Sequence, residues 1–129
     1  MVEVICDTSF LIHLATRKIK NIDSVNTEIG QIQFVVPSVV LAELEKLSKN
    51  QEKKQDATAT LEFTQKLKTI EISGKFADQA IIEYVRNHRG MIATMDKELK
   101  NKIKSLNGSI ISLSNDKIVL ESYLNLTVV

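Results

Sequence analysis

Short apolar runs alternate with amphipathic segments along the whole chain. Consecutive apolar residues are typical of buried strands, whereas apolar residues spaced three or four apart indicate a helix with one buried face. The apolar runs lie at 2–7, 32–36, 91–95 and 109–113, with a further short one near 69–72. Helical spacing covers 10–19, 21–30, 39–49, 61–70, 77–88 and 97–106. Strands that alternate with helices in this way predict a mainly parallel sheet with helices on both faces.

Some segments are marked less clearly than others. The segment 21–30 has helical spacing and stops at Gly30, a residue that commonly follows the end of a helix. Residues 48–60 are polar and rich in Lys, Gln and Thr, which predicts an exposed connection or the exposed start of a helix. Residues 115–129 give no clear pattern.

The length of 129 residues fits a single domain, 1–129, that is large enough to bury a core. Cys6 is the one cysteine, so no internal disulfide is possible, and we expect a reducing, cytoplasmic setting. No apolar stretch approaches the length of a membrane span. Glu3 and Asp7 lie inside the first apolar segment, which argues against a signal peptide.

Four acidic residues fall at or just after the ends of predicted strands. Asp7 directly ends the first apolar run, and Asp96 directly follows the run 91–95. Glu43 lies in the helix after the second strand, and Asp78 lies in the first turn of the helix after the third. Ligands bind beyond the carboxyl ends of the strands in an open parallel sheet. We therefore expect the four carboxylates to converge in one cleft.

Carboxylates that crowd together repel each other unless a cation joins them. Oxygen ligands without a Cys or His set favour Mg²⁺ or Mn²⁺ over Zn²⁺. Such ions activate water and hold phosphate oxygens, so hydrolysis of a phosphodiester is the natural chemistry. Taken singly, Asp78 is more readily explained as an acid near a helix N-terminus, and Glu43 as a solvated helix residue. The interpretation depends on the four acids together.

The segments around these acids resemble the four motifs of the PIN domain, a family of metal-dependent nucleases. They are ICDTSFLI, VPSVVLAELEKL, FADQAII and IATMDKELK, and the resemblance runs from about residue 2 to 113. It implies a three-layer α/β/α fold with a five-stranded parallel sheet and helices on both faces. It also implies that the four acids bind Mg²⁺ or Mn²⁺, that single-stranded RNA is the substrate, and that the protein is a homodimer.

The resemblance also gives possible roles to two hydroxyl groups. Ser9 occupies the hydroxyl position of the first motif and Thr94 that of the fourth, where each is implied to orient a carboxylate or a water. An ordinary turn or strand hydroxyl explains each of them equally well. Asp116 is a candidate for an additional ligand, although an acid at that position is more often a turn residue.

Several functional branches stay open. TMDKELKNKIK and FADQAI look most like the archaeal and eukaryotic PIN proteins of small-subunit rRNA processing, which implies ribosome-assembly factors as partners. Toxins that pair with an antitoxin often have an aromatic residue shortly after the fourth acid, where this chain has Leu99. A non-catalytic RNA-binding scaffold is a third reading, against which the four acids count. Receiver domains and haloacid-dehalogenase phosphatases fit less well, because ICDTS has neither an acidic pair nor an Asp-x-Asp motif.

Lysines beside two of the acids are candidates for contacts with RNA phosphates. The candidates are Lys46, Lys49, Lys97, Lys100 and Lys104. The last three lie opposite an apolar stripe formed by Leu99, Ile103 and Leu106. The net charge of +1 does not by itself indicate nucleic-acid binding, and a solvated helix face explains the lysines equally well. The sequence shows no aromatic platform on which bases could stack.

Overall fold

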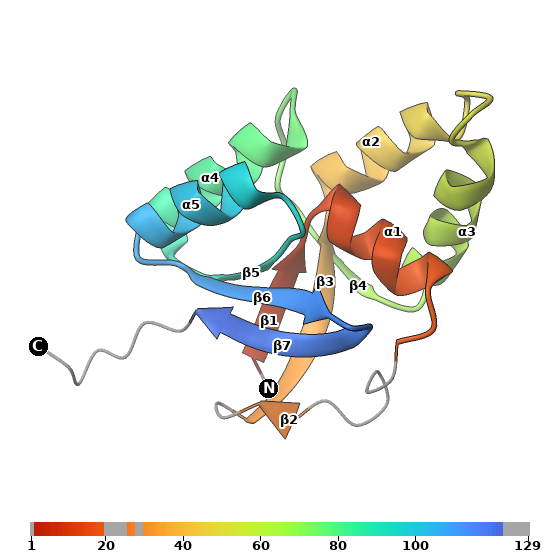
Figure 1. The fold of residues 1–129 in the computed structure, drawn as a ribbon. Coiled ribbons are helices and arrows are strands. Elements are labelled where there is room, and N and C mark those ends of the chain that lie inside the picture. Colours follow the sequence, from red (N-terminus) through yellow and green to blue (C-terminus); the bar gives the residue numbers. More distant parts are fainter. Residues whose placement is uncertain (1, 20–25, 28–29, 123–129) are drawn as a thin grey trace, which may run out of the picture.

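The structure, a computed structural model, describes residues 2–19, 26–27 and 30–122 (Figure 1). Five parallel strands form its centre in the order β4–β3–β1–β5–β6. They are β1 (Val2–Cys6), β3 (Gly30–Pro37), β4 (Lys68–Ile70), β5 (Met91–Ala93) and β6 (Ser109–Ser114). Two antiparallel strands extend the sheet, β2 (Asn26–Thr27) beside β3 and β7 (Lys117–Ser122) beside β6. The predicted five-stranded parallel sheet is therefore present, with two strands that the prediction lacked.

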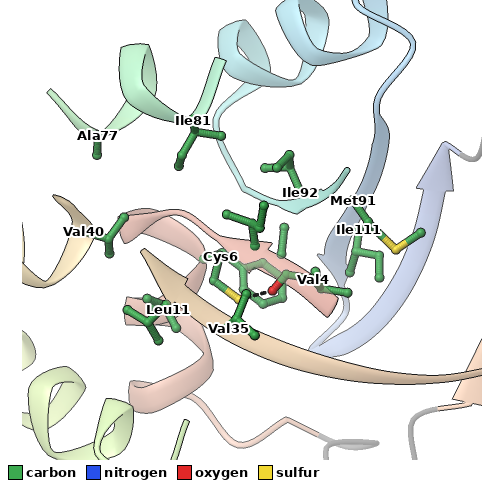
Figure 2. Packing of buried hydrophobic residues seen from close by; sticks show 14 of the residues in the cluster. Val4, Cys6, Leu11, Val35, Val40, Ala77, Ile81, Met91, Ile92 and Ile111 are labelled. Atoms are coloured by element: carbon green, nitrogen blue, oxygen red, sulfur yellow. Dashed lines mark hydrogen bonds between the residues drawn. The ribbon is translucent and has the colours of Figure 1, made fainter. Parts of the chain in front are cut away.

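Five helices in the described residues cover both faces of this sheet. They are α1 (Thr8–Thr16), α2 (Ser38–Leu47), α3 (Lys54–Thr64), α4 (Ala77–His88) and α5 (Lys97–Ser105). Figure 2 shows Ile81 of α4 on one side of the central strands and Leu11 of α1 on the other. This arrangement confirms the predicted α/β class with helices on both faces. None of the described helices is long and apolar enough to cross a lipid bilayer.

The central strand β1 is buried on both faces, which explains why it reads as a continuous apolar run. It pairs with β3 on one side and with β5 on the other, so that Ile5 lies between Val35 and Ile92. Cys6 has no exposed area, and burial raises the pKa of its thiol well above the usual range. The thiol is therefore neutral, and it donates a hydrogen bond to the Val4 carbonyl.

The helix predicted over 61–70 is wrong in its bounds. Helix α3 ends at Thr64, and the short strand expected near 69–72 is present as β4, which begins at Lys68 inside the predicted helix. The helix begins at Lys54, inside the polar segment 48–60, as one of the two expectations for that segment had it. Its buried side chains are Ala57, Thr60 and Thr64. Because these are small or polar, a count of apolar positions does not detect the buried face.

Two other segments also differ from the expectation or extend it. The helix predicted over 21–30 falls largely outside the described residues, but Asn26–Thr27 pairs with β3 as a strand. Within the unassigned segment 115–129, residues 115–122 form the turn and second strand of the β6–β7 hairpin, and the rest lies outside the described residues. The turn residues Asn115 and Asp116 have φ angles of 51° and 58°, as a two-residue type I′ turn requires. Asp116 is thus a turn residue, the reading that the sequence favoured.

Candidate functional site

Asp7 lies where the central strand β1 passes into helix α1. Its backbone N–H donates to the carbonyl of Ala93 at the end of β5 (3.0 Å), which fixes the turn against the neighbouring strand. Its side chain caps α1, because Oδ1 accepts the N–H of Phe10 at 2.9 Å. Only 7% of Asp7 is exposed. The carboxylate is therefore buried at the carboxyl end of the sheet.

Two hydroxyl groups hold the Asp7 carboxylate. Ser9 Oγ donates to Oδ1 at 2.9 Å, and Thr94 Oγ1 donates to Oδ2. Thr94 has no exposed area, and its Oγ1 also accepts the backbone N–H of Asp96 at 3.0 Å. A continuous chain of hydrogen bonds thus joins Asp7 to Asp96 through Thr94. Both hydroxyls singled out in the sequence contact this carboxylate.

Asp96 follows β5 and caps helix α5. Its Oδ1 accepts the N–H groups of Glu98 and Leu99, at 2.9 and 3.3 Å. Its other carboxylate oxygen makes no hydrogen bond with the described residues, and the side chain is exposed. The capping role therefore leaves one oxygen of Asp96 available to a ligand.

The electrostatics of this pair of acids favour a cation. Burial raises the pKa of the Asp7 carboxyl, hydrogen bonds from Thr94, Phe10 and Ser9 lower it, and the charge of Asp96 raises it, so that the pKa lies above its usual value. No Lys, Arg or His among the described residues forms an ion pair with Asp7. A buried carboxylate with an acidic neighbour and no cation is destabilised in its charged form. Hard oxygen donors in this setting fit Mg²⁺ or Mn²⁺.

The other two acids lie apart from this pair. Glu43 is half-buried on α2, where it lines a separate cavity, and Asp78 is exposed in the first turn of α4, where its Oδ1 accepts the N–H of Gln79 at 2.9 Å. Across residues 2–19, 26–27 and 30–122, no three His, Cys, Asp or Glu side chains lie close enough to hold one ion. The expected convergence of all four acids is therefore not found. Like charges repel when no cation joins them, and Asp78 is bonded to its own helix.

Comparisons with known proteins agree on one family. A family model described as a PIN like domain matches residues 4–116. The chain belongs to the PIN-like domain family. It is 32% identical over 117 residues to Ribonuclease VapC4 of the archaeon Methanocaldococcus jannaschii, an alignment that covers 83% of this chain and 86% of that protein.

Solved structures show the same fold. The structure of the PIN domain endonuclease Utp24 superimposes with a TM-score of 0.76 at 26% identity, over 95% of this chain and 93% of that one. A domain of a functionally unknown protein from Methanocaldococcus jannaschii gives a TM-score of 0.59 at 16% identity, over 98% of both chains. The second likeness supports the fold alone.

Two of the candidate lysines of this PIN-like domain already have a partner. Lys100 and Lys104 of α5 contact the carboxylate of Glu121 on β7, at 2.8 and 3.3 Å, and Ser112 donates to the same group at 2.7 Å. Hydrogen bonds from Lys100, Ser112 and Lys104 lower the pKa of Glu121 to about 2. β7 thus supplies a counter-charge that the sequence did not predict, and contacts of Lys100 and Lys104 with RNA phosphates stay a prediction.

The remaining candidates, Lys46, Lys49 and Lys97, are exposed, and none forms an ion pair with a carboxylate in the described part of the chain. Sequence reasoning also missed one aromatic side chain. Phe76 is 53% exposed, the one large hydrophobic residue in the described ranges that faces solvent. Its position directly before the apolar face of α4 gave no sign of this exposure.

Proposed function

We propose that this PIN-like domain is an endoribonuclease that hydrolyses phosphodiester bonds of single-stranded RNA with Mg²⁺ or Mn²⁺. The observation that carries the proposal is the buried Asp7 carboxylate, joined to Asp96 through Thr94 and without a cationic side chain. The family match supports it, as do two similar proteins whose names include ribonuclease and endonuclease.

Each residue of the site has a role in this proposal. Asp7 and Asp96 hold the cation, which when bound lowers the pKa of water and offsets phosphate charge. Thr94 and Ser9 fix the Asp7 carboxylate through hydrogen bonds, so that it does not reorient when substrate binds. Glu43 and Asp78 are proposed to join the other two acids once a cation offsets the repulsion between the acids, because without one no three described acids lie close enough to hold an ion. Lys46, Lys49 and Lys97 bind phosphates of the RNA.

Two biological settings are consistent with this chemistry. The resemblance of TMDKELKNKIK to PIN proteins of small-subunit rRNA processing favours a role in ribosome assembly, with assembly factors as partners. The 32% identity to Ribonuclease VapC4 favours a toxin that an antitoxin inhibits. A small antitoxin-like reading frame beside the gene would favour the toxin setting. The resemblance also implies a homodimer, which sedimentation equilibrium tests directly.

A circular single-stranded RNA tests the proposal, because an endonuclease opens a circle and an exonuclease does not. We expect the wild-type protein to linearise the circle with Mn²⁺, and EDTA to stop the reaction. The Asp7→Asn variant keeps the side-chain shape without the charge, and should lower the rate by on the order of a hundredfold or more. Asp56→Asn is the matched control, since Asp56 is an exposed acid in the first turn of α3. Equal cleavage by wild type and Asp7→Asn would show that Asp7 does not carry the reaction, and the interpretation as a non-catalytic scaffold would then replace that as an enzyme.

A further inference from the structure

We propose that a cavity between α2 and the loop before α4 is a subsite for one unpaired nucleotide of the RNA. In this subsite Phe76 stacks on the base, and Lys46 and Lys75 bind the adjacent phosphates. The inference rests on the proposed ribonuclease function and extends it to how the RNA is held. The cavity measures about 440 Å³, which lies within the range of roughly 300–1,000 Å³ that is usual for ligand pockets. Its lining includes Val39, Ala42, Glu43, Lys46, Lys75 and Phe76.

Hydrogen bonds hold the walls of the cavity in place. Ser38 Oγ donates to the carbonyl of Ile72 at 3.0 Å and accepts its N–H at 3.1 Å, while the N–H of Val39 donates to the same carbonyl at 3.0 Å. The loop that precedes α4 therefore stays beside the start of α2, as Figure 1 shows. Gly74 allows this loop to approach α4, because a Cβ at this position would lie 2.8 Å from the Cβ of Ala80.

Phe76 gives the cavity an aromatic surface. A single exposed hydrophobic side chain is common on proteins, so exposure alone carries no function. Phe76 differs in its place, because it lines a cavity whose other lining residues include the charged side chains of Glu43, Lys46 and Lys75. Every base has a flat face that stacks on an aromatic ring, which makes such a ring a general contact for single-stranded RNA. The proposed stacking on Phe76 departs from the expectation that the chain has no aromatic platform.

The charges of the cavity complement a phosphate. Lys75 Nζ lies 5.6 Å from the centre of the Phe76 ring, and Lys46 projects from α2 into the same lining. In the described residues neither lysine forms an ion pair, in contrast to Lys100 and Lys104 on Glu121. Two ammonium groups and the single carboxylate of Glu43 leave the lining positive. Glu43 is the single acid in this lining, and Asp7 and Asp96 do not line the cavity.

Binding of a fluorescent single-stranded RNA, measured by anisotropy in the Asp7→Asn background, tests the subsite without cleavage. We expect Phe76→Ala to weaken binding about tenfold, the loss typical of one stacked base. Phe76→Tyr keeps the ring and should bind like the parent, whereas Phe76→Leu keeps apolar area alone and should bind like Phe76→Ala. An oligonucleotide of the same length without bases should bind the Phe76→Ala and parent proteins equally.

The lysines predict a different pattern. Lys46→Ala and Lys75→Ala should weaken binding to the RNA and to the abasic strand alike, and each should flatten the salt dependence by about 0.7 of a slope unit. Lys66→Ala is the matched control, an exposed lysine beyond the end of α3 without an ion pair in the described residues. Thermal unfolding of each variant confirms that the fold is retained.

Three results would overturn the subsite. They are unchanged binding by Phe76→Ala, full binding by Phe76→Leu, and an equal loss with Phe76→Ala on the abasic strand. If wild type opens the circular RNA while any of these results holds, the subsite fails and the nuclease stands. If wild type neither cleaves nor binds RNA, the proposed function fails and the subsite fails with it.

Discussion

Replacement of Thr94 by valine tests whether one hydroxyl joins the two acids of the site. The Thr94 hydroxyl donates to Asp7 Oδ2 and accepts the N–H of Asp96 at 3.0 Å, in a side chain without exposed area. Valine has nearly the same shape, so Thr94→Val removes both hydrogen bonds and leaves the packing in place. A buried carboxylate oxygen and a half-buried N–H then lose their partner.

The size of the effect follows from these two bonds. A hydrogen bond to a charged group contributes about 1.5–3 kcal/mol, and one between neutral groups about 1 kcal/mol. The free energy of unfolding should therefore fall by roughly 2–4 kcal/mol, which is on the order of 10 °C in Tm for a domain of this size. Urea denaturation at neutral pH measures the first quantity, and calorimetry the second.

Thr94→Ser is the control, because it keeps the hydroxyl and removes one buried methyl group, which costs about 1 kcal/mol. The pKa of Asp7 lies above its usual value, and the hydroxyl of Thr94 lowers it. Without the hydroxyl the pKa of Asp7 in the folded protein rises further above its unfolded value. The folded variant therefore takes up a proton that the unfolded chain does not, and its free energy of unfolding increases as the pH falls through the folded pKa. The deficit of Thr94→Val should thus be largest at neutral pH and shrink in acid. A loss no larger than that of Thr94→Ser, at every pH, refutes the reasoning.

Two further predictions concern contacts outside the Asp7–Asp96 pair. Glu121→Gln should lower the free energy of unfolding by about 1 kcal/mol at neutral pH, a value reduced from the full pKa shift because the carboxylate is partly in water. The folded pKa of Glu121 is about 2, below its unfolded value of about 4.5. The difference in unfolding free energy between wild type and Glu121→Gln should therefore disappear as the pH falls from about 4.5 towards 2, which urea denaturation at several pH values measures. A difference that stays constant over this pH range would contradict the prediction. Gly74→Ala should lower the free energy of unfolding by roughly 1–3 kcal/mol, because the added Cβ meets Ala80. The loss should be smaller in an Ala80→Gly background, which thermal unfolding measures. Equal losses in both backgrounds would count against this contact.

The parallel centre of the fold could be predicted because buried strands appear as unbroken apolar runs. For the start of α3 the sequence left a connection and an exposed helix start both open, because the buried threonines of this helix satisfy their own hydroxyls within it. Thr60 Oγ1 donates to the carbonyl of Asp56 and Thr64 Oγ1 to that of Leu61, both at 2.7 Å. Such polar residues are buried without leaving an apolar period in the sequence.

The site shows the same division between local and long-range information. The positions of Asp7 and Asp96 follow from the strand ends, which are local features of the sequence. The pairing of Lys100 with Glu121 depends on a hairpin that brings β7 to α5, across 21 residues of chain. The exposure of Phe76 depends on how its loop packs against α2. Both lie beyond what the period of apolar residues can indicate.

Direct titration of Mn²⁺ into the protein, followed by calorimetry at neutral pH, tests the central claim that the Asp7–Asp96 pair binds a divalent cation. The account predicts saturable binding by the wild-type protein and by the Asp56→Asn control. It predicts that Asp7→Asn weakens this binding by more than about tenfold while its circular dichroism spectrum stays that of a folded protein. Equal Mn²⁺ affinity in the three proteins, or no binding by wild type at millimolar Mn²⁺, would contradict it.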